Sequence, residues 1–99
     1  MRPIHVARLD KSRPVLLLTR ELVRPHLNTL TVAPITMTIR GISTEVPLTE
    51  ENGLTGPSVA SCDNITTIPK DTLGAQIGVL LDHQESMLSE AIRAAFDLD

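Results

Sequence analysis

Aromatic residues are almost absent from this chain, which has one Phe among 99 residues and neither Trp nor Tyr. A protein that stacks several unpaired bases on aromatic rings needs more of them, so that mode of nucleic-acid binding is nearly excluded. The core must instead be aliphatic, and a hydrophobic content of 41% is enough to form one. This length suits one domain and is too short for two, so we expect a single domain over residues 1–99.

Cysteine and long apolar runs are also scarce. Cys62 is the one cysteine and cannot form an internal disulfide, so we expect a small buried strand residue there. No apolar run approaches the length of a membrane span. Residues 1–5 lead directly into strand-like sequence and do not form a signal peptide. Together these features predict a soluble protein in the reducing cytoplasm, without a membrane.

Motifs for metals and nucleotide cofactors are missing as well. His5, His26 and His83 are far apart and show no ligand spacing, and no pair of carboxylates has the pattern of a metal clamp. There is no glycine-rich phosphate loop. Nothing in the sequence supplies Ser61 or Cys62 with an activating base. We therefore expect neither a metal nor a cofactor.

Charge is divided unevenly along the chain. Residues 1–40 carry seven Lys or Arg against two acids, a net charge of +5. Residues 41–99 carry two basic residues against ten acids, a net charge of −8. The first half can face a polyanion that the second half would repel, unless the basic residues scatter over several surfaces.

Short β-branched and alternating segments dominate the first 80 residues. Pro34 within one of them indicates an edge strand or a bulge, and Pro25 is expected to end a helical turn at 20–24. The expected strands span residues 4–9, 13–19, 29–36, 43–48, 57–62, 65–68 and 75–80.

A helical period follows the last expected strand. Asp82 as N-cap and Glu85 three residues later match a capping box. The apolar residues of this segment fall largely on one helical face, namely Leu81, Met87, Leu88, Ala91, Ile92, Ala95 and Phe96. Many short strands followed by one helix predict a mainly β (α+β) fold, a small twisted barrel closed by helical segments.

The segment 13–19 is the most informative of the strands. Val15 to Leu18 are apolar without alternation, which predicts burial on both faces. Pro14 is tolerated at a strand start, so it joins Arg13 rigidly to the edge of the core. Considered alone, Arg13 is best interpreted as a salt-bridged surface arginine.

Taken together, these segments resemble the MazF/PemK family, the toxins of bacterial toxin–antitoxin pairs. The resemblance rests on the Arg-Pro strand at 13–18, the strand end Val-Ala-Pro-Ile-Thr at 32–36 and the terminal helix. Residues 44–48 and 53–65 are similar to later strands of that family. The resemblance implies a small SH3-like barrel of the CcdB/MazF kind with a C-terminal helix.

The resemblance also implies a metal-independent endoribonuclease that cleaves single-stranded RNA in messenger, transfer or ribosomal RNA. Its catalytic residues correspond to Arg13 and Thr36. In such a reaction the RNA 2′-hydroxyl attacks the neighbouring phosphorus and leaves a 2′,3′-cyclic phosphate. A guanidinium can bond two phosphoryl oxygens at once, and a threonine hydroxyl can donate to the developing charge.

Other site residues are expected around this pair. Arginine is a poor proton acceptor, so the general base is left open between His5, Asp10 and a water molecule. The turn at 10–12 is shorter than is usual in the family, so we expect it to influence specificity. The candidate RNA-binding residues are Lys11, Ser12, Thr38, Arg40, Asp63 and Asn64.

The expected partners also follow from the resemblance. It implies a homodimer whose RNA groove lies near the subunit interface and is covered by the acidic C-terminal segment of a MazE-like antitoxin. Two alternatives keep the fold without the nuclease. One is a toxin that poisons a protein target such as DNA gyrase, and the other is a non-toxic barrel that binds peptides.

Overall fold

The computed structural model describes all residues from Met1 to Asp99, and its regular elements are strands, short 3-10 helices and one α-helix. Seven strands are present: β1 (Pro3–Arg8), β2 (Ser12–Leu17), β3 (Thr29–Thr36), β4 (Glu45–Leu48), β5 (Ser58–Ser61), β6 (Thr66–Pro69) and β7 (Leu73–Val79). The 3-10 helices are η1 (Arg24–His26), η2 (Glu50–Asn52), η3 (Cys62–Asn64), η4 (Lys70–Thr72) and η5 (Asp82–Gln84), and the α-helix is α1 (Glu85–Phe96). A helix of this length does not cross a bilayer, and no helix that could do so is present.

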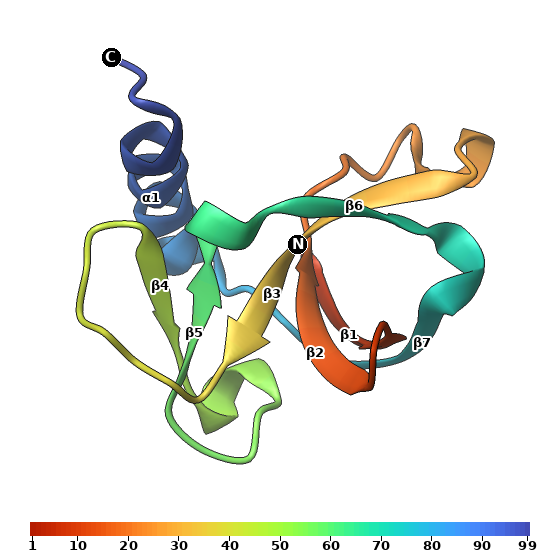
Figure 1. Cartoon of the computed structure of the whole chain (residues 1–99), viewed down its shortest axis with the longest axis horizontal. Coiled ribbons are helices and arrows are strands. Elements are labelled where there is room, and N and C mark those ends of the chain that lie inside the picture. Colours follow the sequence, from red (N-terminus) through yellow and green to blue (C-terminus); the bar gives the residue numbers. More distant parts are fainter.

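The strands form one curled antiparallel sheet in the order β4-β5-β3-β2-β1-β7, with β6 paired to β3. Figure 1 shows α1 beside β4 and β5 at one end, and the β1–β2 hairpin with β7 at the other. The predicted mainly β fold with a closing C-terminal helix is confirmed. All seven expected strands exist, although several begin or end a few residues away from their predicted positions.

Strand β3 lies in the middle of the sheet, although it contains Pro34. On one side it pairs with β2, and on the other with β5 and then β6. Between the pairs Ile35–Ala60 and Val32–Thr66, β3 advances three residues while the opposite chain advances six. The three extra residues are accommodated by η3, which interrupts the ladder opposite the proline. Pro34 is thus neither on an edge strand nor at a bulge of β3 itself, because the interruption lies in the facing chain. A gap in the facing ladder suits a residue that has no N–H to donate.

Strand β2 is buried on both faces, as its non-alternating sequence predicts. Leu16 packs in a core cluster with α1, while Val15 and Leu17 pack in a second cluster on the other face of the sheet. All three side chains are at most 2% exposed. The second cluster is closed by Leu30 and Ile68, because β6 curls over that face.

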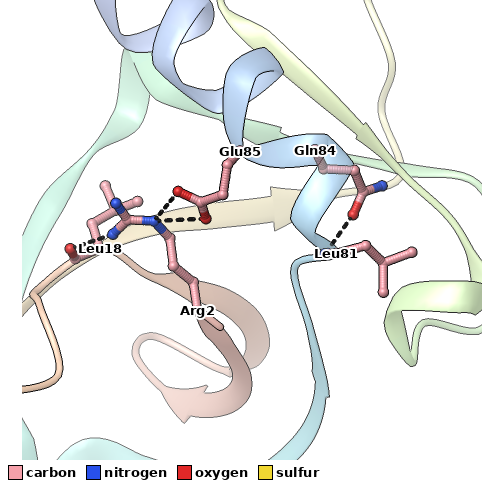
Figure 2. A network of polar contacts seen from close by, with 5 residues as sticks. All are labelled: Arg2, Leu18, Leu81, Gln84 and Glu85. Carbon is pink, nitrogen blue, oxygen red and sulfur yellow. Dashed lines mark hydrogen bonds and ion pairs between the residues drawn. The ribbon is translucent and has the colours of Figure 1, made fainter.

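The predicted capping box of Asp82 and Glu85 is wrong. Residues 82–84 form η5, and the side-chain oxygen of Gln84 accepts from the backbone N–H of Leu81 at 2.9 Å. Glu85 instead pairs with Arg2, whose Nε lies 3.1 Å from the carboxylate (Figure 2). Arg2 also donates to the carbonyl of Leu18 at 2.7 Å. This clamp links the first turn of α1 to the end of β2.

Two other helical predictions need correction. Pro25 does not end a turn at 20–24 but lies within η1, where the first helical turn needs no proline N–H. On α1, Leu88 and Ala91 are buried and Ile92 packs against the core. Met87 and Phe96 remain 38% and 56% exposed, so the apolar face of the helix is wider than the surface it covers.

Candidate active site

Arg13 and Thr36 are placed together by the register of β2 and β3. The ladder pairs Val15 with Pro34, Leu16 with Ala33 and Leu17 with Val32. The residue numbers of each pair sum to 49, so the same register continued by two residues sets Arg13 opposite Thr36. Residues two apart on a strand share a face, and so do directly opposed residues. The two side chains therefore leave the sheet on the same side.

Both side chains line one cleft of about 520 Å³. Four of the six candidate RNA-binding residues line it as well, namely Thr38, Arg40, Asp63 and Asn64. These residues come from the segment after β3 and from η3, two parts of the chain that sequence spacing does not connect. The structure therefore brings together six of the ten residues predicted for the site.

The remaining four predicted residues lie outside the cleft lining. Lys11 is exposed in the β1–β2 turn, and Ser12 is exposed at the first position of β2. His5 faces β7, and its Nδ1 lies 2.9 Å from the carbonyl oxygen of Gly74. Asp10 is also in the turn and reaches the site through Arg13. The wall of the cleft thus contains neither of the two side chains considered as general base.

Asp10 forms an ion pair with Arg13, its carboxylate oxygen lying 3.4 Å from Nε. The backbone N–H of Lys11 donates to the same oxygen at 3.0 Å. This hydrogen bond is the largest cause that lowers the pKa of Asp10 below its ordinary value, and the positive charge of Arg13 adds to it. The salt-bridged arginine expected from the sequence is present. Nε is the Arg13 nitrogen that lies closest to this carboxylate.

Thr36 is half-buried at the end of β3, and its hydroxyl oxygen accepts from the backbone N–H of Thr38 at 3.1 Å. This contact uses a lone pair and leaves the hydroxyl proton free to donate. It also fixes the oxygen at the point where the chain leaves the sheet. Thr36 can therefore offer a positioned O–H donor to a ligand in the cleft.

Asp63 and Glu45 are the acidic residues of the cleft lining, and both accept hydrogen bonds from other groups of the chain. The Thr44 hydroxyl donates to the Asp63 carboxylate at 2.7 Å, which joins the start of β4 to η3. The Glu45 carboxylate accepts from backbone N–H groups of the 38–42 segment. Arg40 makes no ion pair, so its guanidinium is free. Glu45 and Ser61 are lining residues that the sequence analysis missed, because nothing in their sequence context distinguishes them.

Arg20 belongs to a second cleft, of about 350 Å³, at the opposite end of β2 from Arg13. Arg2 and Arg24 line it together with the acids Glu21, Asp82 and Glu85. Positive and negative side chains are balanced there, and none of the residues predicted for catalysis contributes.

The side chains of this structure form neither a metal-binding cluster nor a reactive thiol. No set of three or more His, Cys, Asp and Glu side chains is placed to hold a metal ion. Cys62 is 1% exposed, and burial raises the pKa of its thiol to about 11. Its predicted burial is confirmed, but it is the first residue of η3 and not a strand residue as predicted. The thiol stays protonated near neutral pH.

The sequence profile described as "PemK-like, MazF-like toxin of type II toxin-antitoxin system" matches residues 4–96. The chain therefore belongs to this family of toxins, which confirms the resemblance drawn from its strands. It is 67% identical to "Endoribonuclease MazF3" of Mycobacterium tuberculosis over 99 residues, which is 100% of this chain and 96% of that protein. It is also 33% identical over 85 residues to "Probable endoribonuclease MazF2" of the same species, covering 85% and 83% of the two chains.

Solved structures agree with this assignment. The fold superposes with a TM-score of 0.97 on "Mycobacterium tuberculosis toxin MazF-mt6", at 66% identity and 99% coverage of both chains. It superposes with a TM-score of 0.87 on "Endoribonuclease in complex with its cognate antitoxin from Mycobacterial species". The identity in that second comparison is 26%, over 98% of this chain and 93% of the other.

Proposed function

We propose that this chain is the toxin of a type II toxin–antitoxin pair and acts as an endoribonuclease on single-stranded RNA. One observation carries the catalytic part of the proposal: Arg13 and Thr36 line the same cleft, at strand ends that the register of β2 and β3 sets opposite each other. The 67% identity to a protein named endoribonuclease supports the choice of substrate and reaction. Cleavage of RNA in the cytoplasm would inhibit translation and arrest growth.

The proposed reaction uses the RNA's own nucleophile. The 2′-oxygen forms a bond to the adjacent phosphorus, the bond from phosphorus to the 5′-oxygen breaks, and a 2′,3′-cyclic phosphate and a free 5′-hydroxyl result. Negative charge grows on the phosphoryl oxygens in the transition state. Catalysis then depends on donors placed where that charge develops, and it needs no metal ion.

Arg13 and Thr36 supply such donors in this proposal. Asp10 approaches Arg13 most closely at Nε. In this proposal the N–H groups on the two Nη atoms bind two phosphoryl oxygens. The Thr36 hydroxyl donates to the same phosphoryl group. Asp10 has a lowered pKa and is a weak base, and His5 points to β7. Proton transfer from the 2′-hydroxyl, and to the 5′-oxygen, is therefore assigned to water in the open cleft.

RNA binding is assigned to the rest of the cleft wall. Arg40 offers an unpaired guanidinium to a neighbouring phosphate, while Thr38 and Asn64 offer polar groups to bases. Lys11 in the β1–β2 turn and Ser12 at the start of β2 precede Arg13, where they can contact RNA that extends past it. Because no aromatic side chain lines the cleft, bases are recognised here by hydrogen bonds and not by stacking on rings.

The proposed partners are a second copy of this chain and an antitoxin. Exposed apolar side chains lie in and next to the cleft lining. Leu9 and Ile42 line it, and Met37 and Ile39 alternate with the lining residues Thr38 and Arg40. Such a surface fits a dimer contact beside the RNA groove. An extended acidic segment of a MazE-like antitoxin would complement Arg13 and Arg40 and block the groove. The relative solved with its cognate antitoxin supports this partner.

The proposal is tested by incubating the purified protein with end-labelled single-stranded RNA in EDTA, beside Arg13→Ala and Thr36→Ala. We expect the wild type to cleave and both variants to lose cleavage while they remain folded. Products that end in a 2′,3′-cyclic phosphate would support the proposed attack by the 2′-hydroxyl. Intact RNA together with growth arrest that survives Arg13→Ala would overturn the proposal and favour poisoning of a protein target. Expression without growth arrest would favour the peptide-binding barrel.

A further inference from the structure

Glu45 lines the cleft with its negative charge, although the proposed ligand is a polyanion. Its carboxylate does not face the cleft unpartnered. Oε1 accepts from the backbone N–H groups of Gly41 at 2.8 Å, Arg40 at 3.2 Å and Ile42 at 3.4 Å. Oε2 accepts from Arg40 at 3.2 Å. One side chain thus satisfies three consecutive backbone donors.

The loop that Glu45 holds has few other anchors. Residues 37–42 are all exposed, and they form no strand or helix. Gly41 adopts a left-handed φ of +73°, which turns its N–H toward the carboxylate together with those of its neighbours. At the far end the Glu45 N–H donates to the carbonyl of Ile42 at 3.1 Å, closing the turn. Glu45 itself is secured on β4, where it pairs with Ser61 of β5.

This loop forms one wall of the cleft, through Thr38, Arg40 and Ile42. A charged acceptor binds backbone N–H groups more strongly than a neutral one. Without it, an exposed loop with a left-handed residue would sample many conformations, and Arg40 would have to be ordered each time a ligand binds. The carboxylate therefore prepares the wall before RNA arrives.

We infer that Glu45 is a positioning residue for substrate binding, which holds the loop 38–42 so that Arg40 and Thr38 face the RNA. The inference rests on the proposed ribonuclease function. It assigns Glu45 to recognition and leaves the chemistry to Arg13 and Thr36. Loss of the carboxylate should weaken RNA binding and broaden the set of cleaved sequences, with little change in the chemical step.

The first test is Glu45→Gln, which keeps the side-chain length but replaces one acceptor oxygen with an NH₂ group. Glu50→Gln is the matched control, because Glu50 is exposed and lies outside the cleft. We expect KM for labelled RNA to rise about tenfold in Glu45→Gln, the scale of one charge-assisted hydrogen bond. We expect kcat to stay within about twofold, and Glu50→Gln to match the wild type.

A second pair of variants tests the same loop without touching the carboxylate. A Cβ added at Gly41 would meet no atom within 4 Å, so Gly41→Ala acts only through the cost of positive φ. Asn tolerates this conformation better, so Gly41→Asn should largely restore KM. This pair decides the inference if Glu45→Gln fails to fold.

Two further measurements do not depend on activity. Backbone amides 40–42 should exchange with solvent faster in Glu45→Gln than in the wild type. In the Arg13→Ala background, Glu45→Gln should weaken RNA binding by a factor similar to its effect on KM. Unchanged KM and binding with faster amide exchange would overturn the inference, and so would a fall in kcat at unchanged KM. A wild type that binds RNA without cutting it would refute the proposed function alone, while a wild type that binds no RNA would refute both.

Discussion

The register of β2 and β3, continued two residues past the pair Val15–Pro34, sets Arg13 opposite Thr36, and both side chains line one cleft. Directly opposed residues of antiparallel strands have Cβ atoms about 5 Å apart. Both side chains can therefore reach the same phosphoryl group. The pairing is rigid because Val15, Leu16 and Leu17 beside Arg13 are buried on both faces.

Replacing Arg13 should abolish most of the RNA cleavage. Removal of one preorganised donor at a developing charge lowers kcat by about a hundredfold to a thousandfold. We expect Arg13→Ala to lower kcat by at least this much. Arg13→Lys should recover only part of the rate, because an ammonium cannot bond two oxygens in the same planar fork. Arg20→Ala serves as control, since Arg20 lies at the other end of β2. Equal losses in Arg20→Ala and Arg13→Ala would contradict the assignment.

Thr36 should act through its hydroxyl and not through its shape. Thr36→Val keeps the volume and removes the O–H donor, so we expect kcat to fall about a hundredfold. Thr36→Ser keeps the donor and should retain most of the rate. The comparison is made by single-turnover cleavage of labelled RNA. A Val variant as active as the Ser variant would show that the hydroxyl takes no part.

Asp10 should orient Arg13 without titrating near neutral pH. Its pKa is lowered in the folded chain, mainly by the Lys11 N–H and also by Arg13. Its small contribution to stability is therefore present above the unfolded pKa and is lost only as pH falls below about 4. Asp10→Asn should lower kcat by less than about tenfold, with the pH–rate profile between about pH 5 and 8 unchanged in shape. A profile whose acid limb disappears in Asp10→Asn would instead identify Asp10 as the general base.

The amide pair of Asn52 and Gln84 should contribute strongly to stability. Asn52 is 0% exposed and Gln84 7% exposed, and Nδ2 of Asn52 donates to Oε1 of Gln84 at 2.7 Å. The same Nδ2 donates to the carbonyl of Val79, so the pair joins η2, η5 and the end of β7. Loss of either amide leaves buried polar groups without partners, at a cost of about 1–3 kcal/mol in the free energy of unfolding.

A double-mutant cycle by urea unfolding at one protein concentration measures this coupling. The variants are Asn52→Ala, Gln84→Ala and the double variant, with the exposed Gln76→Ala as control. The double variant should be more stable than the sum of the single losses predicts, by about 0.5–3 kcal/mol. Strict additivity would show that the two amides act independently.

The sequence predicted secondary structure correctly where the spacing of apolar residues directly reflects which faces are buried. The uninterrupted apolar run of β2 predicts a strand buried on both faces because alternation is lost only when both sides are covered. The terminal helix was predicted for a similar reason, since its apolar residues repeat with the helical period. The capping box failed because Gln84 caps the turn locally, and Glu85 finds Arg2 83 positions away in the chain.

For the candidate site too, some features are visible in the sequence and others only in the structure. Arg13 and Thr36 are recognisable from their strand ends and from the family resemblance, but their opposition depends on the register between β2 and β3, which no local pattern specifies. Glu45 went unnoticed because its role lies in backbone N–H groups, which every residue except proline carries. Such a role leaves no residue-type pattern in a single sequence.

The amino-acid sequence by itself determined a mainly aliphatic β fold with a closing helix, a basic first half and the family of the chain. These features depend on composition and on the spacing of apolar residues over a few positions, both of which can be read without knowing the conformation. Only the tertiary structure decided that Arg13, Thr36, Thr38, Arg40, Asp63 and Asn64 line one cleft while His5 faces away. It also decided that the Glu45 carboxylate binds the backbone N–H groups of residues 40–42. Those outcomes depend on strand register and on the three residues of η3, since a shift by one residue would turn each side chain to the other face.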